Sequence, residues 1–137
     1  MEEAATSRQT LKKTERLHLK SQIDRLFGGG HSRSFTSFPL RVVLQEIPFD
    51  ETTPHAQILV SVPKRHLKHA VDRNRVKRQV REAYRKNKQS LLALLAAERK
   101  ALAIAFIWMD RHMHSSAEIE TIVVQLLSHI AENIQSR

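Results

Sequence analysis

The stretch Ala70–Lys88, AVDRNRVKRQVREAYRKNK, combines the spacing of a half-buried helix with a high density of positive charge. At about 100° per residue, one face of this helix collects the apolar side chains Val76, Val80, Ala83 and Tyr84. Such a face predicts a helix that packs against a sheet. A basic stripe runs beside it, consisting of Lys77, Arg78, Arg81, Arg85 and Lys88.

Apolar segments on both sides of this helix predict the remaining elements. Residues 37–47, 56–64 and 101–110 are rich in Val, Leu, Ile and Ala and are predicted to be strands. Residues 14–27 and 115–134 show helical spacing, and residues 90–100 continue the basic helix after a bend near Asn87. The order α-β-β-α-β-α predicts a two-layer α/β (α+β) sandwich, in which a small mixed sheet packs against helices.

Length and composition are those of one globular domain. The 137 residues are 41% hydrophobic and include no cysteine, which excludes disulfides and thiolate metal sites. We expect a single domain over residues 1–137, with residues 1–13 as a flexible polar arm. The N-terminal residues lack the apolar core of a signal peptide and no run is long enough to span a bilayer, so a cytoplasmic location is expected.

The net charge of +9 is concentrated in one short segment. Residues 64–88 hold eleven Lys and Arg against Asp72 and Glu82, which accounts for all of it. Like charges also recur four residues apart, as in Arg73–Lys77 and Lys77–Arg81, where each pair costs a few tenths of a kcal/mol on a solvated helix. A polyanion would turn this repulsion into attraction, so the segment predicts a nucleic-acid partner. Charge alone leaves both RNA and DNA open.

The longer stretch Ser61–Arg85, SVPKRHLKHAVDRNRVKRQVREAYR, resembles the signature of the bacterial ribonuclease P protein component. The resemblance covers roughly residues 15–130. It rests on an Arg-Asn-Arg core followed by Lys-Arg and a further Arg, on a strand that ends in a basic pair, on an Arg-Leu pair that opens the first helix, and on two phenylalanines. In this sequence the matching residues are Arg73, Asn74, Arg75, Lys77, Arg78, Arg81, Ser61, Val62, Lys64, Arg65, Arg16, Leu17, Phe27 and Phe38.

The resemblance implies a function and a set of site residues. Family members bind the catalytic RNA of ribonuclease P and the 5′ leader of precursor tRNA, and the RNA with its Mg²⁺ ions performs the hydrolysis that removes the leader. The implied RNA-binding residues are Lys64, Arg65, Lys68, Arg73, Asn74, Arg75, Lys77, Arg78, Arg81 and Arg85. The implied leader cleft consists of Arg16, Lys20, Ile23, Phe27 and Arg41. The resemblance also implies a left-handed βαβ crossover around the signature helix, against the usual preference.

Three positions depart from the family pattern. Ile23 and Arg41 stand where many members carry cleft aromatics, and Leu59 replaces a common glycine of the second predicted strand. Stacking of bases on aromatic rings is worth roughly 1–3 kcal/mol per base. An arginine at position 41 offers instead a guanidinium that stacks on a base or pairs with a phosphate.

The same residues fit other functions, such as a nuclease, a metal site or a DNA-binding protein, less well. A nuclease or metal site would need a third ligand beside the histidine pairs His66/His69 and His112/His114, and only Asp110 lies near in sequence. We therefore predict no catalytic residue and no metal ligand in the protein. A DNA-reading helix would carry more base-reading polar side chains. A ribosomal-type RNA-binding protein shares the basic helix and stays the alternative.

Overall fold

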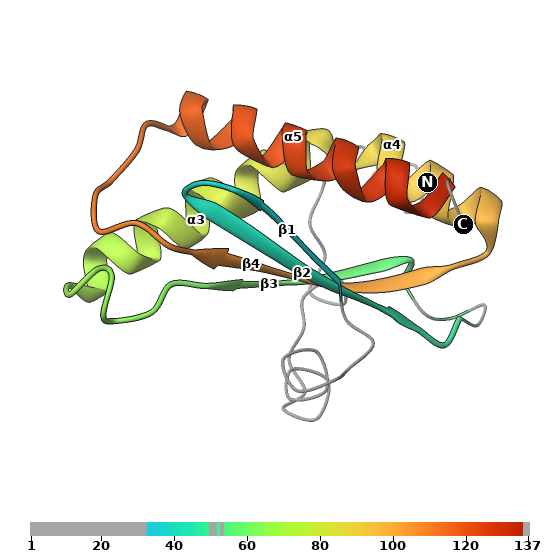
Figure 1. The fold of residues 1–137 in the computed structure, drawn as a ribbon, viewed down its shortest axis with the longest axis horizontal. Coiled ribbons are helices and arrows are strands. Elements are labelled where there is room, and N and C mark those ends of the chain that lie inside the picture. The colour runs from blue at the N-terminus through green and yellow to red at the C-terminus, as the bar shows by residue number, and fades with distance from the viewer. Residues whose placement is uncertain (1–32, 50–51, 53, 136–137) are drawn as a thin grey trace, which may run out of the picture.

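A computed structural model describes residues 33–49, 52 and 54–135 of the chain (Figure 1). The strands are β1 (Arg33–Ser37), β2 (Leu40–Ile47), β3 (Ala56–Ser61) and β4 (Ala101–Trp108). The helices are α3 (Ala70–Asn87), α4 (Gln89–Glu98) and α5 (Ser116–Gln135). The helix predicted over residues 14–27 and the arm over residues 1–13 lie outside the described residues.

The described strands form one mixed sheet in the order β1-β2-β4-β3. β2 pairs with β1 and with β4 in antiparallel register, whereas β3 and β4 are parallel. A parallel pair needs a crossover connection between its strands, and here α3 and α4 provide it. The predicted mixed sheet and the βαβ unit around the basic helix are confirmed, and the left-handed crossover stays a prediction.

Alternating side chains of the strands separate the two faces of the sheet. Leu40, Val42 and Leu44 of β2 are buried in the main core, and their partners on β4 are Trp108, Phe106 and Ile104. The helices α3, α4 and α5 all lie on this side of the sheet (Figure 1). The opposite face carries a much smaller apolar cluster of Val43, Ala103 and Ala105. We call this second side the open face, because none of the three described helices covers it.

The helix faces predicted from spacing are the buried ones. Val76, Val80, Ala83 and Tyr84 of α3 are at most 3% exposed. The helical spacing of residues 115–134 brings Ile119, Ile122, Val123, Leu126, Leu127 and Ile130 to one face of α5, and only Ile122 among them is partly exposed. Within the described part of the chain, no helix is long and apolar enough to cross a membrane.

The sequence prediction missed one strand. The strand predicted over residues 37–47 is β2, which begins only at Leu40 because the chain turns at Phe38–Pro39, and β1 precedes this turn as an additional edge strand. β1 has the sequence RSFTS, in which Phe35 is the only large apolar residue, so it gives no strand signal. Side chains of α5 hold it in place: Gln125 accepts a hydrogen bond from Ser37 at 2.9 Å, and Asn133 accepts one from Arg33 at 2.8 Å.

Truncation of a core residue of α5 should destabilise the fold strongly. Leu126 is fully buried between α5 and the sheet, so Leu126→Ala should lower the unfolding free energy by about 2–5 kcal/mol. Val124 lies on the same helix and is 40% exposed, so Val124→Ala is the matched control and should cost much less. Urea denaturation of both variants measures the difference, and equal losses would contradict the assigned core.

Candidate nucleic-acid interface

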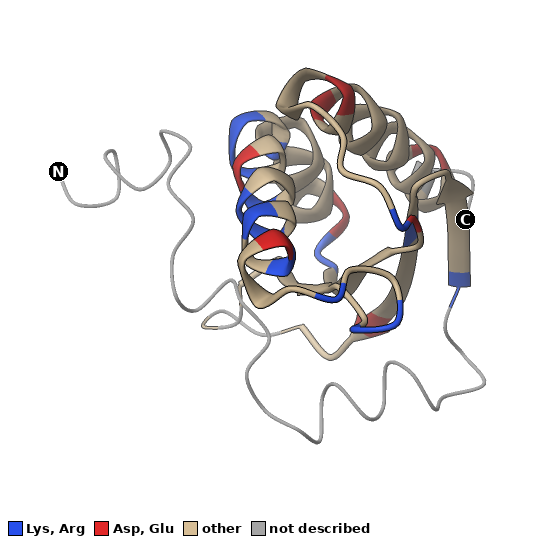
Figure 2. Cartoon of the chain, turned by 90° about the vertical axis from the view of Figure 1, so that its left-hand side faces the viewer, with Lys and Arg blue, Asp and Glu red and all other residues tan. Residues whose placement is uncertain are grey.

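Cations gather along the outer side of α3 and in the loop that precedes it. Figure 2 shows them at the end of the molecule where α3 begins. Because the apolar face of α3 is fixed against the core, the basic side chains of the helix lie on its outer side. We call this surface the α3 flank. It comprises Lys64, Arg65, Lys68, Asn74, Arg75, Lys77, Arg78, Arg81 and Arg85.

Five cations of the α3 flank have no neutralising contact in the part of the chain that the structure describes. Lys64, Arg65, Lys68, Arg75 and Arg78 are exposed, and within the described residues their charged groups have no hydrogen bond or ion pair. Asn74 is exposed as well and its side chain has no described partner, so nothing in the structure suggests that it fixes the backbone. The flank therefore presents charges that are open to an external anion.

Glu82, one of the two acids of α3, is engaged by a neighbouring arginine. Glu82 forms a bidentate ion pair with Arg85, with distances of 2.6 and 3.0 Å between carboxylate oxygens and guanidinium nitrogens. The hydrogen bond from Arg85 holds the pKa of Glu82 below its ordinary value. Glu82 thus compensates the charge of Arg85, whereas Arg75 and Arg78 form no ion pair with any described residue.

Arg73 has a structural contact that its neighbours lack. Its Nη1 atom donates to the backbone carbonyls of Leu67 and Lys68, at 2.9 and 2.8 Å. These bonds tie the first turn of α3 to the preceding loop, which carries Lys64, Arg65 and Lys68. Arg73 therefore positions part of the flank, whatever else it binds.

Lys88 does not belong to the basic surface, and its place in the predicted stripe is wrong. Its side chain is only 1% exposed. α3 ends at Asn87, whose side-chain nitrogen donates to Ala83 O at 2.8 Å and to Glu120 at 3.0 Å. Since Lys88 separates α3 from α4, the rotation of 100° per residue no longer applies to it. The bend predicted near Asn87 is confirmed.

Arg41 lies exposed on the open face of the sheet. In the register it stands between Thr36 of β1 and Ile107 of β4, and Ile107 in turn neighbours Ser61 of β3. Leu59 lies one row away on the same face, where its side chain joins the small cluster with Val43 and Ala105. The other predicted cleft residues, Arg16, Lys20, Ile23 and Phe27, lie outside the described residues.

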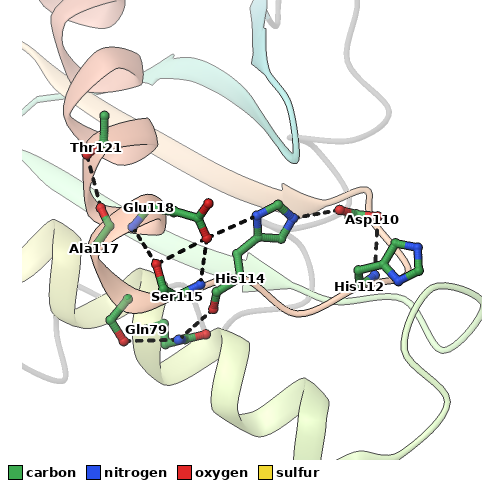
Figure 3. A network of polar contacts seen from close by, with 9 residues as sticks. Gln79, Asp110, His112, His114, Ser115, Ala117, Glu118 and Thr121 are labelled. Carbon is green, nitrogen blue, oxygen red and sulfur yellow. Dashed lines mark hydrogen bonds and ion pairs between the residues drawn. The ribbon is translucent and has the colours of Figure 1, made fainter.

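The loop between β4 and α5 is held by a polar network (Figure 3). His114 Nε2 lies 2.7 Å from Asp110 Oδ2, and the ring of His114 meets the Trp108 ring edge-on. Ser115 and Glu118 exchange hydrogen bonds between side chain and backbone in a capping box that starts α5. Ser115 therefore caps the N-terminus of α5. Across the described residues, no group of three or more metal-binding side chains comes together.

Comparison with known proteins identifies the family. The sequence model of the Ribonuclease P family matches residues 11–130. A ribonuclease P protein component of Porphyromonas gingivalis is 38% identical over 126 residues, which cover 92% of this chain and 90% of the relative. The chain belongs to the ribonuclease P protein family. The role of this family in the processing of tRNA 5′ ends agrees with the function that the signature predicted.

Solved structures of ribonuclease P proteins share the fold. The chain aligns with the protein from Thermotoga maritima at a TM-score of 0.63 and 20% identity, covering 84% of this chain and 96% of the other. For the protein from Staphylococcus aureus, the TM-score is 0.59 at 19% identity, with coverages of 85% and 94%. These likenesses confirm the predicted α/β sandwich as the ribonuclease P protein fold.

Sequence reasoning missed Gln79, which joins the basic helix to the β4–α5 loop. Its Nε2 atom donates to His114 O at 3.2 Å and lies 3.1 Å from Ser116 Oγ. Gln79 is largely buried although it neighbours Arg78 in sequence. Its position one residue before Val80, on the border of the apolar face, was the available signal, but the partners 35 and 37 residues away come only from the fold.

Asp110 should stabilise the ribonuclease P fold at neutral pH and lose this effect in acid. Its hydrogen bond with His114, followed by those from the backbone N–H groups of His112 and Arg111, lowers its pKa below the ordinary value of 3.8. A lowered folded pKa contributes stability that is complete above the unfolded pKa and vanishes as the pH falls through the folded pKa. The stability gap between wild type and Asp110→Asn should therefore be constant near neutral pH and shrink below 3.8.

Thermal unfolding of both proteins across the acid range measures this gap. A gap that stays constant down to the lowest accessible pH would contradict the role of the ionised Asp110 carboxylate.

Proposed function

We propose that this chain is the protein subunit of ribonuclease P. In this role it binds the catalytic RNA through the α3 flank and the 5′ leader of precursor tRNA on the open face of the sheet. It thereby assists the endonucleolytic removal of the leader, which forms the mature 5′ end. The hydrolysis belongs to the RNA subunit and its Mg²⁺ ions, and the protein contributes no catalytic residue. Its proposed partners place it in the cytoplasm.

One observation carries the RNA-binding part of the proposal. Arg75 and Arg78 are exposed neighbours on a rigid helix, and neither guanidinium has a partner among the described residues. A guanidinium presents a planar fork of donors that matches two phosphate oxygens. Burial of the apolar face of α3 fixes the side of the helix from which both arginines project, so the two guanidinium groups are presented to the same partner.

The leader-binding part is supported by the position of Arg41. It projects from the open face, whereas the α3 flank lies beyond the β3 edge of the sheet on the helical side. One protein would thus hold two RNA segments on separate surfaces. The row Thr36–Arg41–Ile107–Ser61 offers a hydroxyl at each end, a cation and an apolar side chain, which together suit an extended single strand.

Loss of a flank arginine should weaken binding to the ribonuclease P RNA of the same organism. Arg75→Ala and Arg78→Ala should each reduce affinity and lower the slope of log K against log salt by roughly 0.7–0.9, the share of one phosphate contact. Both side chains are exposed, so the fold should keep its stability. Filter binding over a salt series measures affinity and slope together.

Arg99→Gly is the matched control for these variants. It removes the same charge at the opposite end of the sheet, where β4 begins (Figure 1). Arg99 has a φ of 55°, a left-handed conformation that glycine adopts readily, so this substitution suits the backbone. If Arg75→Ala and Arg78→Ala bind no worse than Arg99→Gly, the α3 flank is not the RNA-binding surface.

Arg41→Ala should reduce the preference of the holoenzyme for a long leader. A lost guanidinium contact with a phosphate or a base should cost about 1–3 kcal/mol of leader binding, with little change for a substrate of minimal leader. Arg41→Lys keeps the charge and loses the planar group, so it separates phosphate pairing from stacking. Affinities of precursor tRNAs with long and minimal leaders provide the measurement. Equal losses for both substrates would remove Arg41 from the leader site.

A further inference from the structure

Three exposed apolar side chains belong to turns and loops at the end of the molecule where β4 terminates. Phe38, in the turn between β1 and β2, is 62% exposed, and Val71, in the first turn of α3, is 78% exposed. Met113, in the β4–α5 loop, is 38% exposed. This end lies at the left of Figure 1 and faces the viewer in Figure 2. Large apolar side chains that gather on one surface indicate a binding site, and neither the α3 flank nor the open face accounts for these.

The turn that carries Phe38 and the loop that carries Met113 form one continuous surface. The backbone N–H of Met109 donates to Pro39 O at 2.8 Å, directly beyond the last pair of the ladder, Leu40 with Trp108. Phe38 precedes Pro39, and Arg111 follows Met109 by two residues. The fold therefore places the turn that carries Phe38 beside the start of the loop that carries Arg111. We call Phe38, Arg111, His112 and Met113 the β4-end surface.

The carboxylates near this surface shape the loop and do not neutralise its cations. Asp110 Oδ1 accepts hydrogen bonds from the backbone N–H groups of Arg111 and His112, at 2.7 and 3.3 Å, and its other oxygen is bound to His114. Glu118 is occupied by Ser115. The Arg111 guanidinium has no hydrogen bond or ion pair with any described residue, and the His112 ring points away from the network in Figure 3.

We propose that the β4-end surface binds a single-stranded segment of RNA. A base stacks on the Phe38 ring, and Arg111 contacts an adjacent phosphate. This inference rests on the proposed function, because it extends the interface with the ribonuclease P RNA beyond the α3 flank. An exposed aromatic ring and cations on one surface are the combination that holds unpaired nucleotides. The Asp110 network and the Gln79 bond to His114 O fix the loop before binding.

Variants of Phe38 test the stacking. Phe38→Ala and Phe38→Leu should each weaken binding of the full chain to the ribonuclease P RNA by about 5- to 100-fold. The salt slope should not change, because no ion pair is lost. Phe38→Trp should bind like the wild type, since it keeps a ring. Phe38→Leu is the decisive variant because it preserves the apolar side chain without a π face, which a protein partner would tolerate. Arg111→Ala, in contrast, should weaken binding and lower the slope of log K against log salt by roughly 0.7, because it removes a phosphate contact.

Val124→Ala is the matched control, because Val124 is the fourth exposed large apolar side chain of the described residues and lies on α5, away from this end. Affinities of Phe38→Ala and Phe38→Leu within twofold of this control would overturn the inference. So would a change in self-association of the free protein with unchanged RNA affinity, which would make the surface a protein contact. If Arg78→Ala weakens RNA binding and Phe38→Ala does not, only the inference fails. If neither variant weakens binding, the proposed function fails too.

Discussion

The packing of α3 on the sheet is the contact on which the rest of this structure depends. Tyr84 meets Phe106 of β4 edge-to-face, with 6.2 Å between ring centroids, and Val76 and Val80 are completely buried beside them. β3 and β4 are parallel neighbours, so the chain between them must cross over the sheet and has to bury a helix there. This buried face fixes the rotation of α3 about its own axis. It therefore also fixes the side of the helix from which each arginine projects. The core and the interface are therefore two sides of the same helix.

This arrangement explains how a helix with so many like charges remains folded. Repulsion between cations one turn apart amounts to a few tenths of a kcal/mol per pair, whereas full burial of one large apolar side chain contributes about 1.5–3 kcal/mol. Four apolar residues of α3 therefore outweigh the repulsion on its flank. The cost that remains in the free protein is removed when phosphates lie against the helix. Binding of a polyanion should for that reason stabilise the fold as well as form the complex.

The spacing of apolar residues predicted correctly which face of a helix is buried when that helix packs against the sheet. The buried faces of α3 and α5 follow from a period of 3.6 residues, and the βαβ order follows from the apolar runs. The predictions from spacing were wrong or incomplete at positions where one element ends and the chain changes direction. Lys88 lies beyond the end of α3, so its predicted exposure was wrong, and β1 has too few apolar residues to be seen before its pairing with β2 is known.

In the candidate site, too, some features could be predicted from the sequence and others could not. The exposed positions of Arg75 and Arg78 could be predicted, because they depend on α3 alone. The roles of Arg73 and Gln79 could not, because both depend on backbone carbonyls that only the fold brings near. A guanidinium that donates to Leu67 and Lys68 carries the same charge in the sequence as one that faces solvent. A count of basic residues thus overstates the number of free cations and says nothing of the residues that hold them in place.

The acidic residues near the basic surface stabilise local structure and leave the cations available to RNA. Glu82 holds Arg85, Asp110 holds His114 and the loop backbone, and Glu118 caps α5 through Ser115. Each of these carboxylates binds a residue close to it in the sequence and so stabilises its own helix or loop. None of the three pairs with Arg75, Arg78 or Arg111. Local use of acids keeps the loops rigid while the positive potential of the surface stays available to a long-range partner. A protein that paired the same acids with its flank arginines would gain little stability, since exposed ion pairs contribute about 0–1 kcal/mol, and would lose much of its attraction for RNA.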